Sequence, residues 1–78
     1  MDFFKKRVRK YQEKKLDEIL SKIQFHQYMK KELEQKIKEI DNSENTKIIK
    51  EIAYHNKIIK IWENNEEKLK KQMSKMDD

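Results

Sequence analysis

The residues considered first for chemistry are two histidines, four serine or threonine hydroxyls and fifteen carboxylates. The hydroxyls belong to Ser21, Ser43, Thr46 and Ser74. None lies at helical spacing from a histidine, so no nucleophile with a neighbouring base is indicated. The chain also has no glycine, and therefore no glycine-rich loop to hold a phosphate. We expect a protein that is not an enzyme and that has no catalytic residue, cofactor or metal.

His26 and His55 are the strongest candidates for other chemistry, as metal ligands or as a pH switch. No Glu-x-x-His motif surrounds either, and Glu51, one turn before His55, is only a weak metal signal. The simpler interpretation is that both are partly buried imidazoles that fill space between helices.

The opening stretch MDFFKKRVRKYQEKK concentrates the positive charge of the chain. Residues 1–15 carry seven basic and two acidic side chains, whereas the remainder carries thirteen of each, so the net charge of +5 lies in this segment. We predict that it binds a partner or nucleic acid through Phe3, Phe4, Lys5, Lys6, Arg7, Val8, Arg9, Lys10, Tyr11, Lys14 and Lys15.

Three ligands suit this basic segment. Nucleic acid would place phosphates on the basic residues and bases on the aromatic rings. A protein partner would bind the segment as a helix in an apolar groove with an acidic rim. An acidic membrane surface is the weakest of the three, because Lys15 interrupts a narrow apolar stripe. The alternative is a solvated terminus, or an arm exchanged between the subunits of a dimer.

Composition restricts the fold that positions these residues. The 78 residues include no glycine, proline or cysteine, and 45% are charged, which is typical of long helices and excludes turn-rich β folds. The longest apolar run is three residues, Ile52 to Tyr54, so we expect no transmembrane segment and a cytoplasmic location. Abundant Lys, Ile and Asn suggest an AT-rich gene, which fits a low-GC bacterium, its phages or its plasmids.

Apolar residues recur with the heptad spacing of packed helices. A first series holds Leu16, Ile19, Ile23, Leu33, Ile37 and Ile40, and a second holds Ile48, Ile52, Ile59, Trp62, Leu69, Met73 and Met76. Six polar residues separate them, from Asp41 to Thr46, and Asn42 or Ser43 is a candidate helix cap. The sequence predicts an all-α hairpin of two long antiparallel helices, with a turn near 41–46. The competing model is one continuous helix in a parallel coiled coil, and a break in helix two near 64–65 is a further alternative.

The predicted hairpin has a specific register. It places Trp62 opposite His26, and Lys30 opposite Ile59, in separate layers of the seam. Lys30 and Glu66 are polar residues at seam positions, so together with His26 and Trp62 they are candidates for setting register or oligomeric state. The alternative for Lys30 and Glu66 is that their long side chains extend from the seam into solvent. Pairing is predicted to end near Gln12, which leaves residues 1–11 as a projecting basic and aromatic N-terminal arm of a single domain over 1–78.

Several large apolar residues, such as Phe25 and Ile61, lie off this seam, which predicts a homodimer of hairpins forming a four-helix bundle. A different protein is the alternative occupant of that surface. We therefore expect a small regulatory, inhibitory or adaptor protein that binds another macromolecule, with a phage- or plasmid-type inhibitor of a host protein as one example. The alternative function is an RNA- or DNA-binding hairpin dimer.

Overall fold

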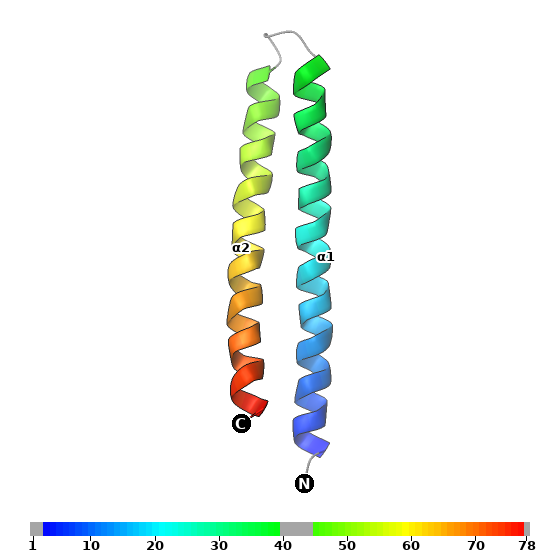
Figure 1. Ribbon diagram of the computed structural model, residues 1–78, viewed down its shortest axis with the longest axis vertical. Helices are drawn as coiled ribbons and strands as arrows, with labels where there is room; N and C mark the ends of the chain where they lie inside the picture. The colour runs from blue at the N-terminus through cyan, green and yellow to red at the C-terminus, as the bar shows by residue number, and fades with distance from the viewer. Residues whose placement is uncertain (1–2, 40–44, 78) are drawn as a thin grey trace.

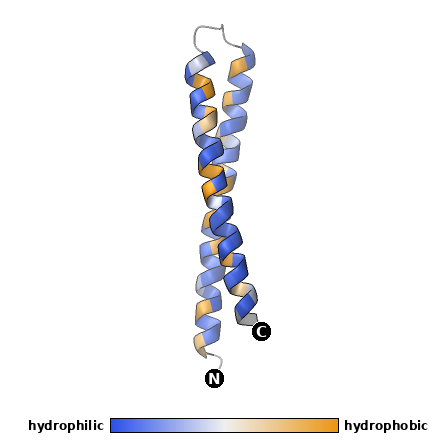
Figure 2. Ribbon diagram, turned by 90° about the vertical axis from the view of Figure 1, so that its left-hand side faces the viewer, coloured by the Kyte–Doolittle hydropathy of each residue, from blue (hydrophilic) through white to orange (hydrophobic). Residues whose placement is uncertain are grey.

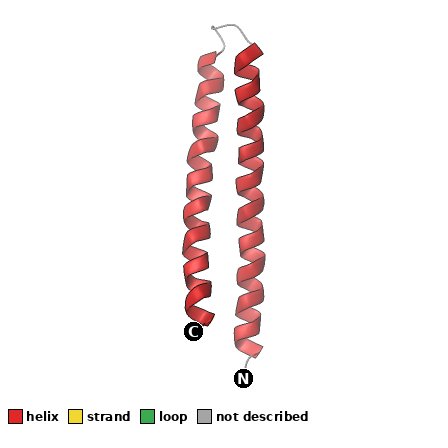
Figure 3. Ribbon diagram, in the orientation of Figure 1, coloured by secondary structure: helices red, strands yellow, loops and turns green. Residues whose placement is uncertain are grey.

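The chain forms two antiparallel helices. The computed structural model describes residues 3–39 and 45–77, in which α1 spans Phe3–Glu39 and α2 spans Asn45–Asp77. The helices lie side by side, and both described chain ends are at the same end of the rod (Figure 1). Figure 3 shows helix throughout both described ranges. The predicted all-α hairpin is confirmed, and the model of one continuous helix is wrong.

The helices are long because nothing in their interiors stops them. Neither contains glycine or proline, the residues most unfavourable within a helix. Lys36 and Lys38 lie in the last turn of α1 and Lys75 in that of α2, where positive charge is favourable to the helix dipole. α2 continues through Asn64 and Asn65, so the alternative break there is wrong. The candidate caps at 42 and 43 fall outside the described residues.

The core is a narrow seam between the helices. Its buried apolar residues in the described ranges are Ile19, Ile23, Leu33 and Ile59. Trp62 and Leu69 are partly buried and pack against the cluster of Ile19, Ile23 and Ile59. Figure 2 shows a mostly hydrophilic ribbon with hydrophobic positions recurring along both helices. Burying one such side chain contributes about 1.5–3 kcal/mol. Since only these four apolar side chains are buried in the described ranges, the core stabilises the hairpin little for a chain of 78 residues.

The hairpin is a rod rather than a globule. It measures 63 × 14 × 13 Å and has a radius of gyration of 17.9 Å. A compact domain of this length would have a radius of gyration of about 11–12 Å. At the end that carries the termini, α1 extends beyond the end of α2 (Figure 1).

The register of the hairpin differs from the prediction by one heptad. The side chain opposite His26 is His55, with an Nδ1–Nδ1 distance of 2.8 Å, whereas the sequence pattern places Trp62, seven residues later, at that position. A heptad pattern does not distinguish these registers, because a slip of seven residues still brings each seam position against its counterpart. The observed register joins the two imidazoles and lets Trp62 pack with Ile19, Ile23 and Ile59.

This shift brings α2 further along the basic segment than the predicted register does. Gln12 is buried and Val8 is half-buried. Tyr11 shares a groove with Leu69 and Gln72 of α2. In this register α2 reaches further along the basic segment than in the predicted one, and the projecting arm over residues 1–11 stays a prediction.

Candidate binding surface

The predicted binding residues all lie in the first turns of α1, and all but Val8 are exposed. Lys6, Arg7, Lys10 and Lys14 follow one another at intervals of one, three and four residues, which places them on one side of the helix. That side is opposite Gln12 and the seam, so these four residues form a basic stripe on the outside of the hairpin. Lys5 and Arg9 lie outside this stripe, and the Arg9 guanidinium lies 3.7 Å from the Glu13 carboxylate.

A second stripe runs along a different side of the same segment. Phe4, Val8, Tyr11 and Lys15 are spaced by four, three and four residues, so they share a helix face. Phe4 is 75% exposed and Tyr11 65% exposed, which are high values for aromatic side chains. The basic stripe thus lies apart from Phe4, Val8 and Tyr11, whereas Lys15 lies in the second stripe and Phe3, 81% exposed, lies nearer the basic stripe.

The second stripe, which holds Phe4, Val8, Tyr11 and Lys15, continues into a shallow groove between the helices. Tyr11, Lys15 and Ile19 line it from α1, and Trp62, Lys68 and Leu69 are among those that line it from α2. One helical turn beyond Ile19 along α1, the Lys22 ammonium lies 4.9 Å from the centre of the Trp62 ring, which is a cation–π contact. The groove shows that these flanks of α1 and α2 form one continuous face of the hairpin.

The charge of the basic segment opposes the stability of its helix. The N-terminal end of a helix dipole is positive, so acidic residues are favoured in the first turn. The described first turn of α1 holds no acidic residue, and Lys5 and Lys6 follow directly on Phe3 and Phe4. Each exposed charge in this position costs about 0.3–1 kcal/mol at low salt.

The histidine pair forms a layer of rings in the middle of the seam. The His26 and His55 ring centres are 5.1 Å apart, and Phe25 and Tyr54 each pack edge-on against the histidine that follows them in sequence. Burial lowers the pKa of His26 below its ordinary value of 6.5, and the nearby His55 and Lys22 lower it further. The Nδ1–Nδ1 hydrogen bond requires one nitrogen to donate a proton and the other to accept it, so a doubly protonated pair would break it.

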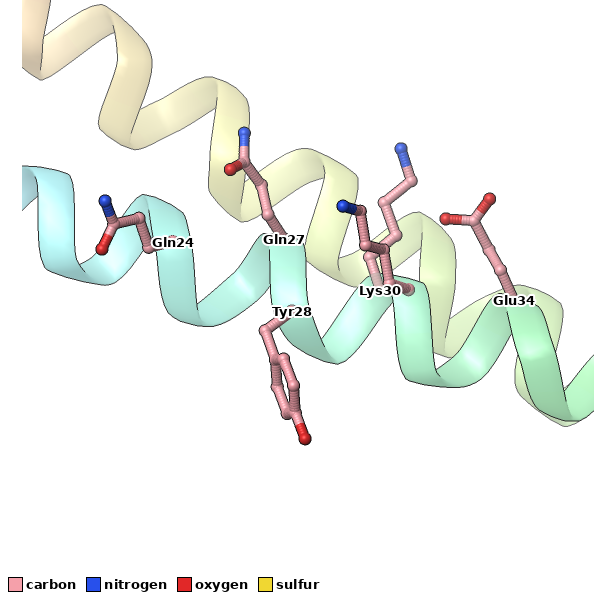
Figure 4. Close-up of a pocket in the computed structure, with 6 residues that line it drawn as sticks. Gln24, Gln27, Tyr28, Lys30 and Glu34 are labelled. Carbon is pink, nitrogen blue, oxygen red and sulfur yellow. The ribbon is translucent and has the colours of Figure 1, made fainter.

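Lys30 and Glu66, the other candidates for setting register, lie apart in the observed register. The Glu66 carboxylate lies 3.5 Å from the Lys70 ammonium, one turn along α2. Lys30 is half-buried and borders a shallow depression formed by α1 residues alone. Figure 4 shows Gln27, Lys30 and Glu34 extending to one side of α1 and Tyr28 to the other, so these side chains do not converge on a common ligand. A role for Lys30 and Glu66 in the oligomeric state stays a prediction.

Two kinds of site are not found in the part of the chain that the structure describes. Residues 3–39 and 45–77 contain no group of three or more His, Cys, Asp or Glu side chains arranged to hold a metal ion. In those same ranges, neither helix has a stretch long and apolar enough to cross a membrane.

The candidate binding residues were predicted from the sequence, but without a division between two sides of the helix. The two stripes follow from helical spacing alone and were available from the sequence. The meeting of His26 with His55, and of Lys22 with Trp62, depends on the register, which the heptads leave open. Comparison of the chain with protein-family models, with curated protein sequences and with solved structures found no match.

Proposed function

We propose that this protein is a non-enzymatic regulator, inhibitor or adaptor that binds an acidic surface of another protein through its basic N-terminal segment. The observation that carries this proposal is the placement of the chain's excess positive charge at the N-terminal end of α1, beside exposed Phe3 and Phe4. This placement costs helix stability. Local choices that oppose stability are expected where a protein has a binding role.

A protein groove suits the division of the segment into two stripes. Phe4, Val8 and Tyr11 offer apolar side chains along one side, as a helix that binds in a groove requires. Lys6, Arg7 and Lys10 lie along another side, where an acidic rim would face them. Buried aromatic anchors supply most of the affinity of such interfaces, whereas exposed ion pairs contribute about 0–1 kcal/mol each.

Nucleic acid is the second candidate ligand. The observation that favours it is the number of exposed basic side chains in residues 5–15, with exposed aromatic rings beside them. Basic residues would contact phosphates and the rings would stack on unpaired bases. Arg7 and Arg9 are the only arginines, so a sequence-specific reading of base edges, for which Arg is the commonest residue, is not favoured.

Capture of partners from the source cell, with and without nuclease treatment, separates the two candidates. One stoichiometric protein recovered in both preparations supports the proposal, and recovery that nuclease abolishes supports nucleic acid. A variant with K5Q, K6Q, R7Q, R9Q and K10Q should lose the ligand. The matched control, K31Q, K38Q, K47Q, K50Q and K57Q, removes the same charge from exposed positions elsewhere and should keep it.

If nucleic acid is the ligand, the salt dependence of binding gives a quantitative readout. Removing about five phosphate contacts should reduce the slope of log affinity against log salt by roughly 3.5 for single strands and 4.5 for duplex DNA. If a protein groove is the ligand, F4A and V8A should weaken binding more than any single lysine substitution.

We also propose that the protein acts in the cytoplasm as a homodimer of hairpins. The support for self-association is the small core of the single hairpin and the number of large apolar side chains that it leaves exposed.

A further inference from the structure

One face of the hairpin collects apolar side chains at mid-length. Phe25 and Tyr54 are both 57% exposed, and Ile61 is 46% exposed. Met29 and Ile58 are half-buried. We call these five residues the Phe25 face.

The five residues share a side because of the antiparallel geometry. Phe25 precedes the seam residue His26 by one position, and Tyr54 precedes His55 in the same way. In two antiparallel right-handed helices, residues that precede facing seam residues project to the same side of the pair. The rings agree with this placement, since Phe25 and Tyr54 pack edge-on against two histidines that are in contact.

Charge is nearly absent from the Phe25 face. Along this side of α1, Lys22 is the only charged residue between Glu18 and Glu32, and its ammonium lies over the Trp62 ring. Along the same side of α2, Lys57 is the one charged residue between Glu51 and Lys68, and it borders the face beside Tyr54 and Ile61. An apolar centre with charges of both signs at its ends is the arrangement of a self-complementary protein interface.

The exposed area of the hairpin matches what a dimer would bury. The accessible surface is 6843 Å², whereas a compact monomer of 9.7 kDa exposes about 5,100 Å². The excess of about 1,700 Å² per chain corresponds to about 3,400 Å² for a pair, within the range of obligate homodimers. Residues 16–78 have no net charge, so two copies can approach along this face without mutual repulsion.

We propose that the Phe25 face is the surface through which two copies of this chain form a four-helix bundle. This inference goes beyond the proposed function by assigning the face, and it does not depend on which macromolecule the basic segment binds. Partner capture tests the binding proposal and sedimentation tests this one, so the failure of either is recognised separately.

Sedimentation equilibrium of matched variants provides the test. The variant F25Q/I61Q changes the Phe25 face, and the control Y28Q/I49Q changes residues of similar exposure at other helix positions. Glutamine is a good helix former, so the substitutions should not break the helices. The unchanged chain and the control should each give a mass of twice 9.7 kDa. The F25Q/I61Q variant should give a mass of 9.7 kDa and retain its helical circular dichroism.

A monomeric unchanged chain, a dimeric F25Q/I61Q variant, or a control that dissociates equally would overturn the proposal. If F25Q/I61Q loses its helicity, the reactivity of an engineered thiol decides instead. Y54C should react with iodoacetamide severalfold more slowly in concentrated than in dilute protein, while Y28C should react at the same rate in both. Equal concentration dependence of the two thiols would mean that another surface, or another partner, is involved.

Discussion

The register of the hairpin is open to a direct chemical test, because the chain contains no cysteine and any engineered pair is unique. The double variant H26C/H55C places two thiols at facing positions, whose imidazole Nδ1 atoms lie 2.8 Å apart in the structure. The comparison variant H26C/W62C places them where the sequence pattern predicts facing residues. Position 62 lies seven residues from position 55, or about 10 Å along a helix. A disulfide requires Cα atoms within about 7 Å. Only H26C/H55C should therefore form an intramolecular disulfide.

The stabilisation expected from this disulfide follows from the length of the loop that it closes. The residues are 29 apart in sequence. Loop-closure entropy for such a separation corresponds to about 3.5 kcal/mol of stabilisation at 25 °C. That is a large share of the 5–15 kcal/mol typical of a folded domain.

The assay compares urea unfolding of oxidised and reduced protein, followed by circular dichroism, with the monomeric mass checked after oxidation in dilute solution. Oxidised H26C/H55C should unfold at clearly higher urea concentration than its reduced form. If H26C/W62C oxidises readily and gains this stability, while H26C/H55C does not, then the register described here is incorrect by one heptad.

Two further predictions concern stability. Because the pKa of His26 is lowered on folding, the unfolded chain binds a proton more readily, so the free energy of unfolding should be highest above pH 6.5 and fall as the pH drops through 6.5 toward the lower folded value. Urea unfolding at pH 7.5 and 5.5 checks this, and H26N should flatten the dependence; a stability that rises on acidification would contradict it. I59A should cost about 2–5 kcal/mol because Ile59 is buried, whereas I61A, two residues along the same helix, should cost below about 1 kcal/mol in dilute solution. Equal losses in the two variants would show that the seam does not run through Ile59.

Much of this fold was predictable because its local and global signals agree. A chain without glycine or proline favours helix throughout, and the polar stretch between Ile40 and Ile48 interrupts the heptads once. The seam residues Ile19, Ile23 and Ile59 were predicted from spacing and are buried. These features depend on periodicity, which a single sequence displays directly.

The register was not predictable in the same way. A slip of one heptad still places seam residues against seam residues and changes only which of them face each other. The register is therefore determined by individual contacts, such as that of His26 with His55. The predicted register kept the polar seam residues in separate layers, whereas the structure pairs two of them through a hydrogen bond. How far α2 reaches along the basic segment depends on the register as well, so the heptad pattern leaves it open for the same reason.

Some surface features can likewise be predicted from the sequence, whereas others require the arrangement of the helices. The positive charge of residues 1–15 can be counted from the sequence, and its opposition to the helix dipole follows once α1 is known to begin at Phe3. The Phe25 face needs the antiparallel arrangement as well, because its residues come from both helices.

The central claim is that the N-terminal end of α1 binds a macromolecule, and deletion of residues 1–10 tests it most directly. The buried residues Ile19, Ile23, Leu33 and Ile59 are all retained, so the truncated hairpin should keep its helical circular dichroism. Capture from the source cell, compared with the full chain, should lose the ligand in the truncated form. Recovery of the same ligand in the same amount by a folded truncated protein would contradict the account, because the basic segment would then be a solvated end of the helix.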